Sequence, residues 1–398
     1  MSAQFPLEDV SWEKYSHVLY SFLVTQADGL ISVEGTDTTL LPQFVELAHA
    51  NGTNAMLSVG GWGGSVYFSS SVGSAANRTA FAQSVLSVIN QYGLDGVEFD
   101  WEYPGGGNGI GCNVNSTSDT ANFLLFLQEL RAQSNGSSLI VSAAVADAPF
   151  ADASDDDIAA FAEVLDYIEM MNYDVWGSFS QFVGPNSPLA DACAPYQDGS
   201  ATSGVQKWTT AGFPANQILL GVASYGHSFL VSQANALTSS SSSSSSGSGN
   251  STSGTLALYP SFEQGTQPQG DSWDVSSAGT TDVCGNSASG SGFSGIWDFW
   301  GLVQEGWLEV DASGGNVTAQ EGIDWTYDEC SQTPFVYNPT SQIMVSYDDP
   351  TSFAAKGQFI VDQGLAGFAM WQAGGDYKDM LLDSINGAMG IDTTICDA

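Results

Sequence analysis

Three acidic residues occupy alternate positions in the segment YGLDGVEFDWEYPG, residues 92–105. Because alternate residues of a β-strand face the same side, Glu98, Asp100 and Glu102 would point together, and the apolar residues between them would point to the opposite side. Carboxyl groups buried close together repel when charged, which raises the pKa of at least one of them. One group would then stay protonated near neutral pH and could act as a general acid. The alternative is a solvated acidic edge strand, but the flanking residues are too apolar for an edge.

The histidines and cysteines give little support for a catalytic or metal site other than the three carboxyl groups. The chain contains three histidines and five cysteines: His17, His49, His227, Cys112, Cys193, Cys284, Cys330 and Cys396. The cysteines are widely spaced and form no C-x-x-C pair, so a zinc site is not expected, and no Ser/His/Asp or Cys/His catalytic set stands out. We therefore expect neither a metal nor a cofactor. Two disulfides with one odd cysteine are expected if the chain is secreted, and buried free thiols are the alternative.

The charge balance excludes several classes of partner. Six Lys+Arg residues stand against 44 Asp+Glu residues in 398, a net charge of −38. So few scattered cations cannot form a phosphate-binding track or bind an anionic membrane surface, so we expect no nucleic acid and no membrane partner. No apolar run is long enough to span a bilayer, and the N-terminal residues do not resemble a signal peptide. A hydrophobic content of 43% suffices for a large core.

Apolar runs of strand length alternate with segments of helical period along most of the chain. The predicted strands are residues 18–24, 54–62, 96–104, 139–146, 167–175, 217–226 and 367–376. Helices are predicted, among others, at residues 76–92, 120–134, 154–166 and 352–364. Near-continuous apolar strands are typical of a parallel sheet covered by helices. The repeated units predict an α/β fold, a TIM (β/α)8-type barrel of which seven strands rather than eight are found.

One region interrupts this alternation. Residues 227–346 contain a serine run and short pieces rich in tryptophan and glycine. We interpret them as an α+β insertion subdomain before the last strand, with a Ser-rich flexible loop at 238–254. Residues 1–226 and 347–398 would then form the barrel. That loop is expected to be a surface segment without a function of its own.

The acidic strand also carries a resemblance to a known family. DGVEFDWEYPG, residues 95–105, resembles the D-G-x-D-x-D-x-E signature of glycoside hydrolase family 18 chitinases. Further segments resemble other motifs of that family, in the same order along the chain: SVGGW (58–62), MNYD (171–174), ASYGHSF (223–229), VSYDDPTSFAAK (345–356) and GFAMWQAGGD (367–376). The resemblance covers nearly the whole chain and implies a barrel enzyme that hydrolyses chitin.

The resemblance implies a role for each acidic residue. Glu102 would be the general acid that protonates the glycosidic oxygen, and later the base that activates water. The 2-acetamido group of the substrate would attack the anomeric carbon, so that no enzyme nucleophile is needed and configuration is retained. Asp100 would orient the acetamido N–H, Tyr173 would donate its hydroxyl to the acetamido oxygen, and Glu98 would share a proton with Asp100.

The resemblance also implies a cleft lined by aromatic side chains. Trp371 would form the floor of the subsite at the reacting sugar, and a core tryptophan is the alternative. Asp174 would accept a hydrogen bond from a sugar hydroxyl, unless it is an ordinary cap. Weaker candidates for lining the cleft, each of which could instead fill the core, are Trp62, Tyr103, Tyr225, Met171 and Phe22.

Two residues depart from the family pattern. Glu98 stands where the family has aspartate, so its carboxyl reaches one methylene further. His227 stands where many members have arginine, which replaces a permanent charge by a group that titrates near neutral pH. His227 is therefore expected to contact substrate in a different way, or to be an ordinary surface histidine.

The N-terminal segment suggests a shorter barrel than the family has. PLEDVSWEKYSHVLYSF, residues 6–22, resembles the family's approach to its second barrel strand. We therefore expect the chain to lack the first strand and to be truncated at this end relative to the family. Seven strands would leave two unpaired edges in a barrel that should close.

We also expect the protein to be secreted, and two alternative functions remain open. Secretion is expected from the family and, weakly, from six N-x-S/T sequons, at Asn51, Asn77, Asn115, Asn135, Asn250 and Asn316. The expected partner is chitin or chitooligosaccharide, bound by a monomer. One alternative is a catalytically weak or inactive glycan-binding lectin on the same scaffold, although such proteins typically lose the catalytic glutamate. The other is an endo-β-N-acetylglucosaminidase, against which the long insertion argues.

Overall fold

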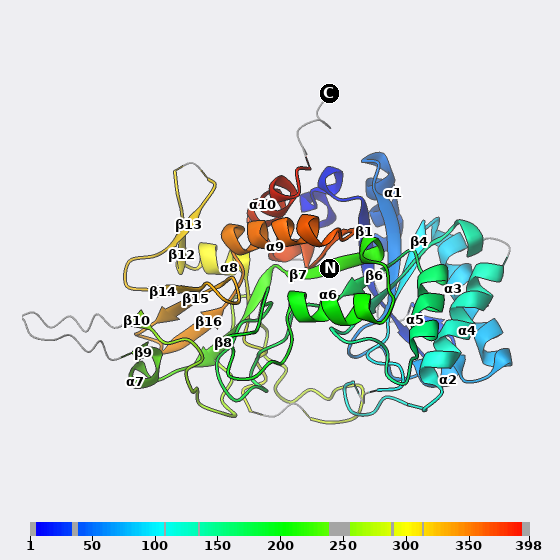
Figure 1. Ribbon diagram of the computed structural model, residues 1–398, viewed down its shortest axis with the longest axis horizontal. Coiled ribbons are helices and arrows are strands. Elements are labelled where there is room, and N and C mark those ends of the chain that lie inside the picture. Colours follow the sequence, from blue (N-terminus) through cyan, green and yellow to red (C-terminus); the bar gives the residue numbers. More distant parts are fainter. Residues whose placement is uncertain are drawn as a thin grey trace, which may run out of the picture.

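The core of the molecule is a curved sheet of seven parallel strands with one short antiparallel strand at its edge (Figure 1). A computed structural model describes the protein over residues 5–33, 39–106, 109–133, 136–238, 255–287, 290–312 and 314–391. The strands of this sheet, in sheet order, are β17 (Gly367–Trp371), β7 (Ile218–Ala223), β6 (Tyr167–Met170), β5 (Ile140–Val145), β4 (Gly96–Asp100), β3 (Asn54–Gly60), β1 (His17–Thr25) and β2 (Ile31–Ser32). The seven predicted strands are confirmed, although several end earlier than expected.

Helices connect the parallel strands and pack on the outer side of the sheet. They are α1 (Leu40–Ala50), α2 (Phe68–Val72), α3 (Ala75–Tyr92), α4 (Asp119–Ala132), α5 (Asp155–Val164), α6 (Ala201–Thr210), α9 (Pro350–Gln363) and α10 (Met380–Ala388). The four helices predicted above correspond to α3, α4, α5 and α9. Local sequence explains two of their starts, because Ser154 and Asp349 each form a capping box that satisfies free N–H groups of the first turn.

The acidic strand β4 has the two faces that its sequence predicts. On the outer face, the ring of Phe99 lies 5.2 Å from that of Phe126 on α4, edge to face. The ring of Trp101 stacks on Phe68 of α2 at 5.0 Å. All four aromatic side chains are buried, which orients the opposite face of β4, with its carboxyl groups, toward the interior of the barrel.

The parallel sheet does not close into a full ring within the described residues. There β1 pairs with β3 and β2, and β17 pairs with β7, but no strand pairs with both β1 and β17. At the carboxyl ends of these two strands the rings of Phe22 and Trp371 approach to 5.4 Å. The sheet is therefore a barrel wall of seven parallel strands with a seam between β1 and β17.

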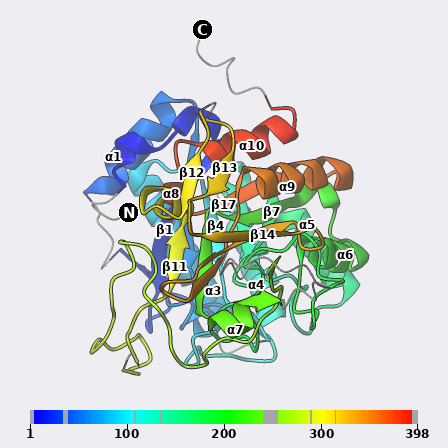
Figure 2. The same ribbon diagram turned by 90° about the vertical axis from the view of Figure 1, so that its left-hand side faces the viewer.

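A second, antiparallel sheet lies beside the barrel, on the left of Figure 1, and Figure 2 shows the molecule from that side. Its strands, in sheet order, are β11 (Ile296–Asp298), β8 (Tyr225–Leu230), β16 (Ile343–Ser346), β15 (Thr333–Asn338) and β14 (Asp324–Asp328). Smaller elements accompany it: α7 (Gln233–Ala236), β9 (Leu237–Thr238), β10 (Thr255–Leu256), α8 (Phe299–Gln304), β12 (Leu308–Val310) and β13 (Val317–Ala319). One strand was predicted at 217–226, but the chain leaves the barrel at Ser224 and continues as β8. Most of the serine-rich loop, residues 239–254, lies outside the described residues.

The remaining regular elements are single turns of 3-10 helix. They are η1 (Leu7–Asp9), η2 (Trp12–Lys14), η3 (Gly136–Ser138), η4 (Ala215–Gln217) and η5 (Ala373–Gly375). Among the helices that the structure describes, none is both long and apolar enough to cross a membrane.

The packing of α4 against β4 gives a test of the core. Phe126 is fully buried, whereas Leu125, the preceding residue of α4, is 47% exposed. We expect Phe126→Ala to lower the free energy of unfolding by ~3–5 kcal/mol, because it removes apolar contacts and leaves a cavity. Leu125→Ala should change it by less than ~0.5 kcal/mol. Urea unfolding followed by circular dichroism measures both, and equal effects would contradict this packing.

Candidate active site

Glu102 lies at the carboxyl end of the barrel, two residues after β4 ends at Asp100. Its backbone is held on both sides: its N–H donates to Ser65 Oγ at 3.1 Å, and its carbonyl accepts from Asn113 Nδ2 at 2.7 Å. The side chain is only 9% exposed. Ser65 belongs to the turn after β3, so neighbouring barrel strands together position this carboxyl group.

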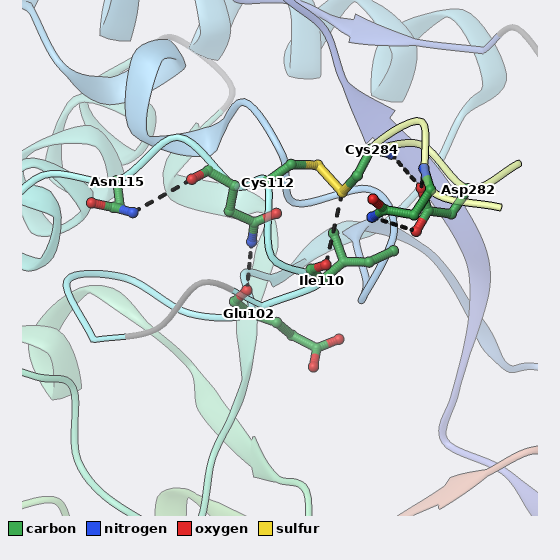
Figure 3. The surroundings of a disulfide bond; sticks show 8 residues. Glu102, Ile110, Cys112, Asn115, Asp282 and Cys284 are labelled. Atoms are coloured by element: carbon green, nitrogen blue, oxygen red, sulfur yellow. Dashed lines mark hydrogen bonds between the residues drawn. A yellow bond between two sulfur atoms is a disulfide. The ribbon is translucent and has the colours of Figure 1, made fainter. Parts of the chain in front are cut away.

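A disulfide stabilises the loop that holds Glu102 (Figure 3). Cys112 is bonded to Cys284, 172 residues away in the sequence. Asn113, which donates to the Glu102 carbonyl, follows Cys112 directly. The carboxyl group of Glu102 points away from this disulfide in Figure 3. The loop after β4 is thus fastened to the segment before β11.

A second disulfide joins Cys193 to Cys330. The expectation of two disulfides is confirmed, and the pairing, which the sequence left open, links loops after β4 and β6 to the inserted region. Cys396 lies outside the described residues.

Burial is the main influence on the Glu102 carboxyl. Loss of solvent raises its pKa from 4.5 to about 7; the hydrogen bond with Tyr103 opposes this, and the negative charge of Asp174 adds to it. At neutral pH a large fraction of Glu102 therefore carries its proton. A carboxyl group protonated near neutral pH is suited to general acid catalysis.

Glu98 and Asp100 lie deeper in the barrel, on the same face of β4. They are 3% and 7% exposed. Burial raises the pKa of both well above the ordinary range, and the charges of Glu169 and of their neighbours on β4 raise it further. Asp100 Oδ1 is buried without a hydrogen-bond partner among the described residues. Because buried polar atoms are usually paired, this oxygen is available to a ligand.

Asp174, Tyr225 and His227 form a hydrogen-bonded group at the rim. Asp174 Oδ1 accepts from the Tyr225 hydroxyl at 2.9 Å and lies 2.7 Å from His227 Nε2. The Asp174 backbone has a positive φ of 54°, and its N–H donates to Asn186 Oδ1. Tyr173 lies next to this group, with its ring 6.3 Å from that of Tyr225. Asp174 thus contacts residues of β8, and its carboxylate is not a simple cap.

A cavity of about 1230 Å³ occupies the barrel interior below the rim. Its lining includes Glu98, Asp100, Tyr173, Phe22 and Trp371. The cavity also extends along the seam, where residues 15–22 and 366–374 line it continuously. The side chains that the motifs placed near the carboxyl ends of different strands therefore converge on one space.

The other predicted lining residues lie around this space or outside it. Trp62, after β3, is 53% exposed, and Tyr103 and Met171 are half-buried at the ends of β4 and β6. None of these three lines the cavity, nor does Glu102, which follows the lining residue Asp100 by two positions. Trp371 is 38% exposed, so it presents a ring face rather than filling the core.

Two acidic residues at the site were not predicted. Glu169 on β6 lines the cavity, and burial raises its pKa to about 7. Asp298 on β11 also lines it, with a pKa raised to about 7 chiefly by burial, and accepts a hydrogen bond from Gln372 next to Trp371. The signal for Glu169 was in the sequence YIEMMNYD, where it shares the strand face of Tyr173. Asp298 had no comparable signal, because its place depends on how the inserted region folds back.

Within the part of the chain that the structure describes, no group of three or more His, Cys, Asp or Glu side chains is arranged to hold a metal ion. Independently of this, burial raises the pKa values of the acids on and after β4, so these groups keep their protons to higher pH than exposed carboxyl groups do.

Comparison with known proteins identifies the family. The family model described as glycosyl hydrolases family 18 matches residues 2–376. The chain belongs to this family. The barrel, the acidic strand and the inserted sheet are thus those of a family 18 protein, as the sequence motifs predict.

Individual relatives agree on the fold and differ in their descriptions. A chitinase-like effector of Moniliophthora roreri is 43% identical over 98% of this chain and 90% of its own length. An endochitinase of Manduca sexta is 28% identical over 92% of this chain and 60% of its own length. Among solved structures, a chitinase of Rhizomucor miehei superimposes with a TM-score of 0.79, at 30% identity, over 96% of both chains.

The raised pKa of Glu102 predicts a pH-dependent stability difference. Below pH 4.5 Glu102 is protonated in both the folded and the unfolded chain; between pH 4.5 and 7 only the unfolded carboxyl ionises, which disfavours folding. Glu102→Gln should therefore gain stability over the wild type as pH rises through this range, by up to ~3 kcal/mol. Urea unfolding at several pH values measures the difference. Glu163→Gln, at an exposed position of α5, should show no such trend, and parallel curves for Glu102→Gln would contradict the assignment.

Proposed function

We propose that this chain is a chitinase that hydrolyses β-1,4 bonds between N-acetylglucosamine units, with Glu102 as general acid and base. The observation that carries the proposal is the buried Glu102 carboxyl, whose pKa of about 7 keeps a proton available beside a deep cavity. Membership of family 18 supports the substrate class. A class V chitinase of Nicotiana tobaccum, which shares the fold, has been solved in complex with NAG4.

In the first step, Glu102 donates its proton to the glycosidic oxygen as the bond between that oxygen and the anomeric carbon breaks. The carbonyl oxygen of the substrate's 2-acetamido group attacks the same carbon and forms an oxazolinium ion. The unpartnered Asp100 Oδ1 accepts from the acetamido N–H and stabilises the positive charge. Tyr173, on the adjoining cavity wall, donates its hydroxyl to the acetamido oxygen.

In the second step, the ionised Glu102 takes a proton from water as the water oxygen attacks the anomeric carbon. The oxazolinium ring opens, and the sugar leaves with retained configuration because two inversions have occurred. Glu102 regains its proton and is ready for another cycle. Glu98 lies behind Asp100 on the same strand face and shares a proton with it, since two buried carboxylates so close do not both ionise readily.

Aromatic and polar side chains would hold the sugar in place. Trp371 and Phe22, with ring centroids 5.4 Å apart, provide an apolar platform at the seam for a sugar face. At the rim, Asp174 is 52% exposed on its side chain and keeps an acceptor for a sugar hydroxyl while it also binds His227. Because His227 is oriented by Asp174, its contact with substrate would be a directed hydrogen bond.

A glycan-binding lectin is the second candidate. The observation that favours it is the seam between β1 and β17, since a barrel that does not close over the described residues holds its site less rigidly. The two relatives at 43% and 41% identity are described as chitinase-like effectors, a description that states likeness to a chitinase. Binding without turnover by the wild type would support this alternative and overturn the proposed hydrolysis.

Secretion as a monomer accompanies the proposal. Two disulfides are typical of an oxidising compartment. The sequon residues within the described ranges, Asn51, Asn77, Asn115 and Asn316, are all exposed and accessible to glycosylation.

Loss of the acid should abolish turnover and preserve binding. We expect Glu102→Gln to lower kcat on a fluorogenic chitooligosaccharide by a factor on the order of 10²–10⁴, because glutamine has no proton to donate. Its affinity for chitotetraose, measured by calorimetry, should stay within about threefold of the wild type. Glu163→Gln serves as the control with the same change of charge. Equal rates for Glu102→Gln and wild type would refute the assignment.

Removal of the platform should weaken binding. Trp371→Ala is expected to lower affinity for chitotetraose by about tenfold, because the sugar loses its stacking surface. Trp325→Ala is a matched control, because Trp325 on β14 is also exposed, at 47%, but does not line the cavity. If both variants bind equally well, Trp371 does not contact the substrate.

A further inference from the structure

We propose that Glu169 is a positioning residue of this site, which acts through Glu98 and Asp100 and sets the pH at which the acidic cluster releases its proton. The inference rests on the proposed hydrolysis but concerns a residue outside the family 18 motifs that the sequence displays. It requires that Glu169 lie with the acids of β4, that no cation neutralise it, and that its charge reach Asp100.

The strand register brings Glu169 level with Asp100. Asp100 pairs with Ala144 of β5, and Ala144 pairs with Glu169 of β6, so the three residues stand at one height on adjacent strands. The two acidic residues are two strand spacings apart, about 10 Å between their Cα atoms. Both line the same cavity, and the small side chain of Ala144 between them leaves room for their carboxyl groups to approach.

A serine on the intervening strand binds Glu169. Ser142 Oγ donates to Glu169 Oε1 at 3.2 Å. Ser142 is also the register partner of Glu98, so its position on β5 lies between β4, which carries Glu98, and β6, which carries Glu169. One polar corner of the barrel interior is therefore formed by Glu98, Asp100 and Glu169. The side chains of Ser142 and Ala144 belong to β5, the strand that separates β4 from β6.

Within the described ranges, no positive charge compensates this corner. The ion pairs found there include none of these carboxyl groups. The other titratable groups that line the cavity here are Tyr167 on β6, Tyr173 three residues after β6 ends, and His17 on β1, whose ring lies 5.8 Å from that of Tyr167. Glu102 stands outside the cavity, beyond the end of β4. Burial lowers the pKa of His17, so it brings no charge at neutral pH.

The charges of the acids therefore act directly on one another. The charge of Glu169, when it is ionised, raises the pKa of Glu98 and that of Asp100. In the proposed mechanism Asp100 must be ionised to stabilise the oxazolinium ion, whereas Glu102 must be protonated to start the reaction. Because the two carboxyl groups oppose each other's ionisation, the presence of Glu169 makes Asp100 harder to ionise and places the acidic limit of activity closer to neutral pH.

The test removes this charge and keeps the shape of the side chain. In Glu169→Gln the acidic limb of the pH profile of kcat/KM for a fluorogenic chitooligosaccharide should move to lower pH by about half a unit or more. The basic limb, which Glu102 controls, should stay in place, because the charges that act on Glu102 are those of other residues. Glu169→Asp, which retains a carboxyl group, should restore much of the wild-type profile.

A second readout does not depend on turnover. Infrared absorption of protonated carboxyl groups, followed against pH in ¹³C-labelled protein, should show the cluster titrating at lower pH in Glu169→Gln than in wild type. Glu163→Gln, on the exposed side of α5, should leave this titration unchanged. If the wild type proves inactive, the proposed hydrolysis fails while the infrared titration still decides the role of Glu169.

Two results would overturn the inference. One is a folded Glu169→Gln protein whose infrared titration matches that of the wild type. The other is a shift of both limbs of the pH profile together, which a general loss of structure would produce. If Glu169→Gln does not fold, the same comparison is made with Glu169→Ala, which also removes the carboxyl group and should shift the titration in the same direction. An unchanged titration in that folded variant also overturns the inference.

Discussion

The burial of several carboxyl groups inside the barrel is the constraint on which the rest of the site depends. Glu98, Asp100 and Glu102 on one strand face, together with Glu169 on β6, lack ion-pair partners among the described residues. Burying such groups as charges is unfavourable, so they hold protons near neutral pH instead. The apolar face of β4 offsets this cost, because Phe99 and Trp101 pack among the aromatic rings of α2, α3 and α4.

The loops around the cavity hold the reactive groups in position. The loop after β4 is fastened through Cys112 and Cys284 to the inserted region, and Asn113 in that loop fixes the backbone of Glu102. At the opposite rim, Asp174 is held by Asn186, Tyr225 and His227. The antiparallel sheet thus contributes to the site through β8 and through the disulfide, in addition to forming a wall beside the barrel. Such outer contacts matter because catalytic groups need fixed geometry.

The acidic cluster and the aromatic rings at the seam share one cavity. The cavity reaches from the acidic cluster to the seam between β1 and β17, where Phe22 and Trp371 meet. At the seam Trp371 remains 38% exposed, so its ring can be reached from outside the barrel. The overall charge of −38 is a separate property, because the proposed substrate, chitin, is neutral and would be bound through stacking and hydrogen bonds.

Periodicity and local motifs were enough to predict the seven parallel strands, the main helices, the family and the shared face of Glu98 and Asp100, which both line the cavity. Each of these features depends on a pattern that a single segment contains. Other features emerged only from the folded chain: the pairing of the cysteines, the contact of Asp174 with His227, and the places of Glu169 and Asp298 beside the acidic strand. Strand boundaries also shifted, since β7 gives way to β8 at Ser224, within one predicted strand. These properties arise from contacts between segments far apart in the chain, and neither spacing nor composition records which distant segments will meet.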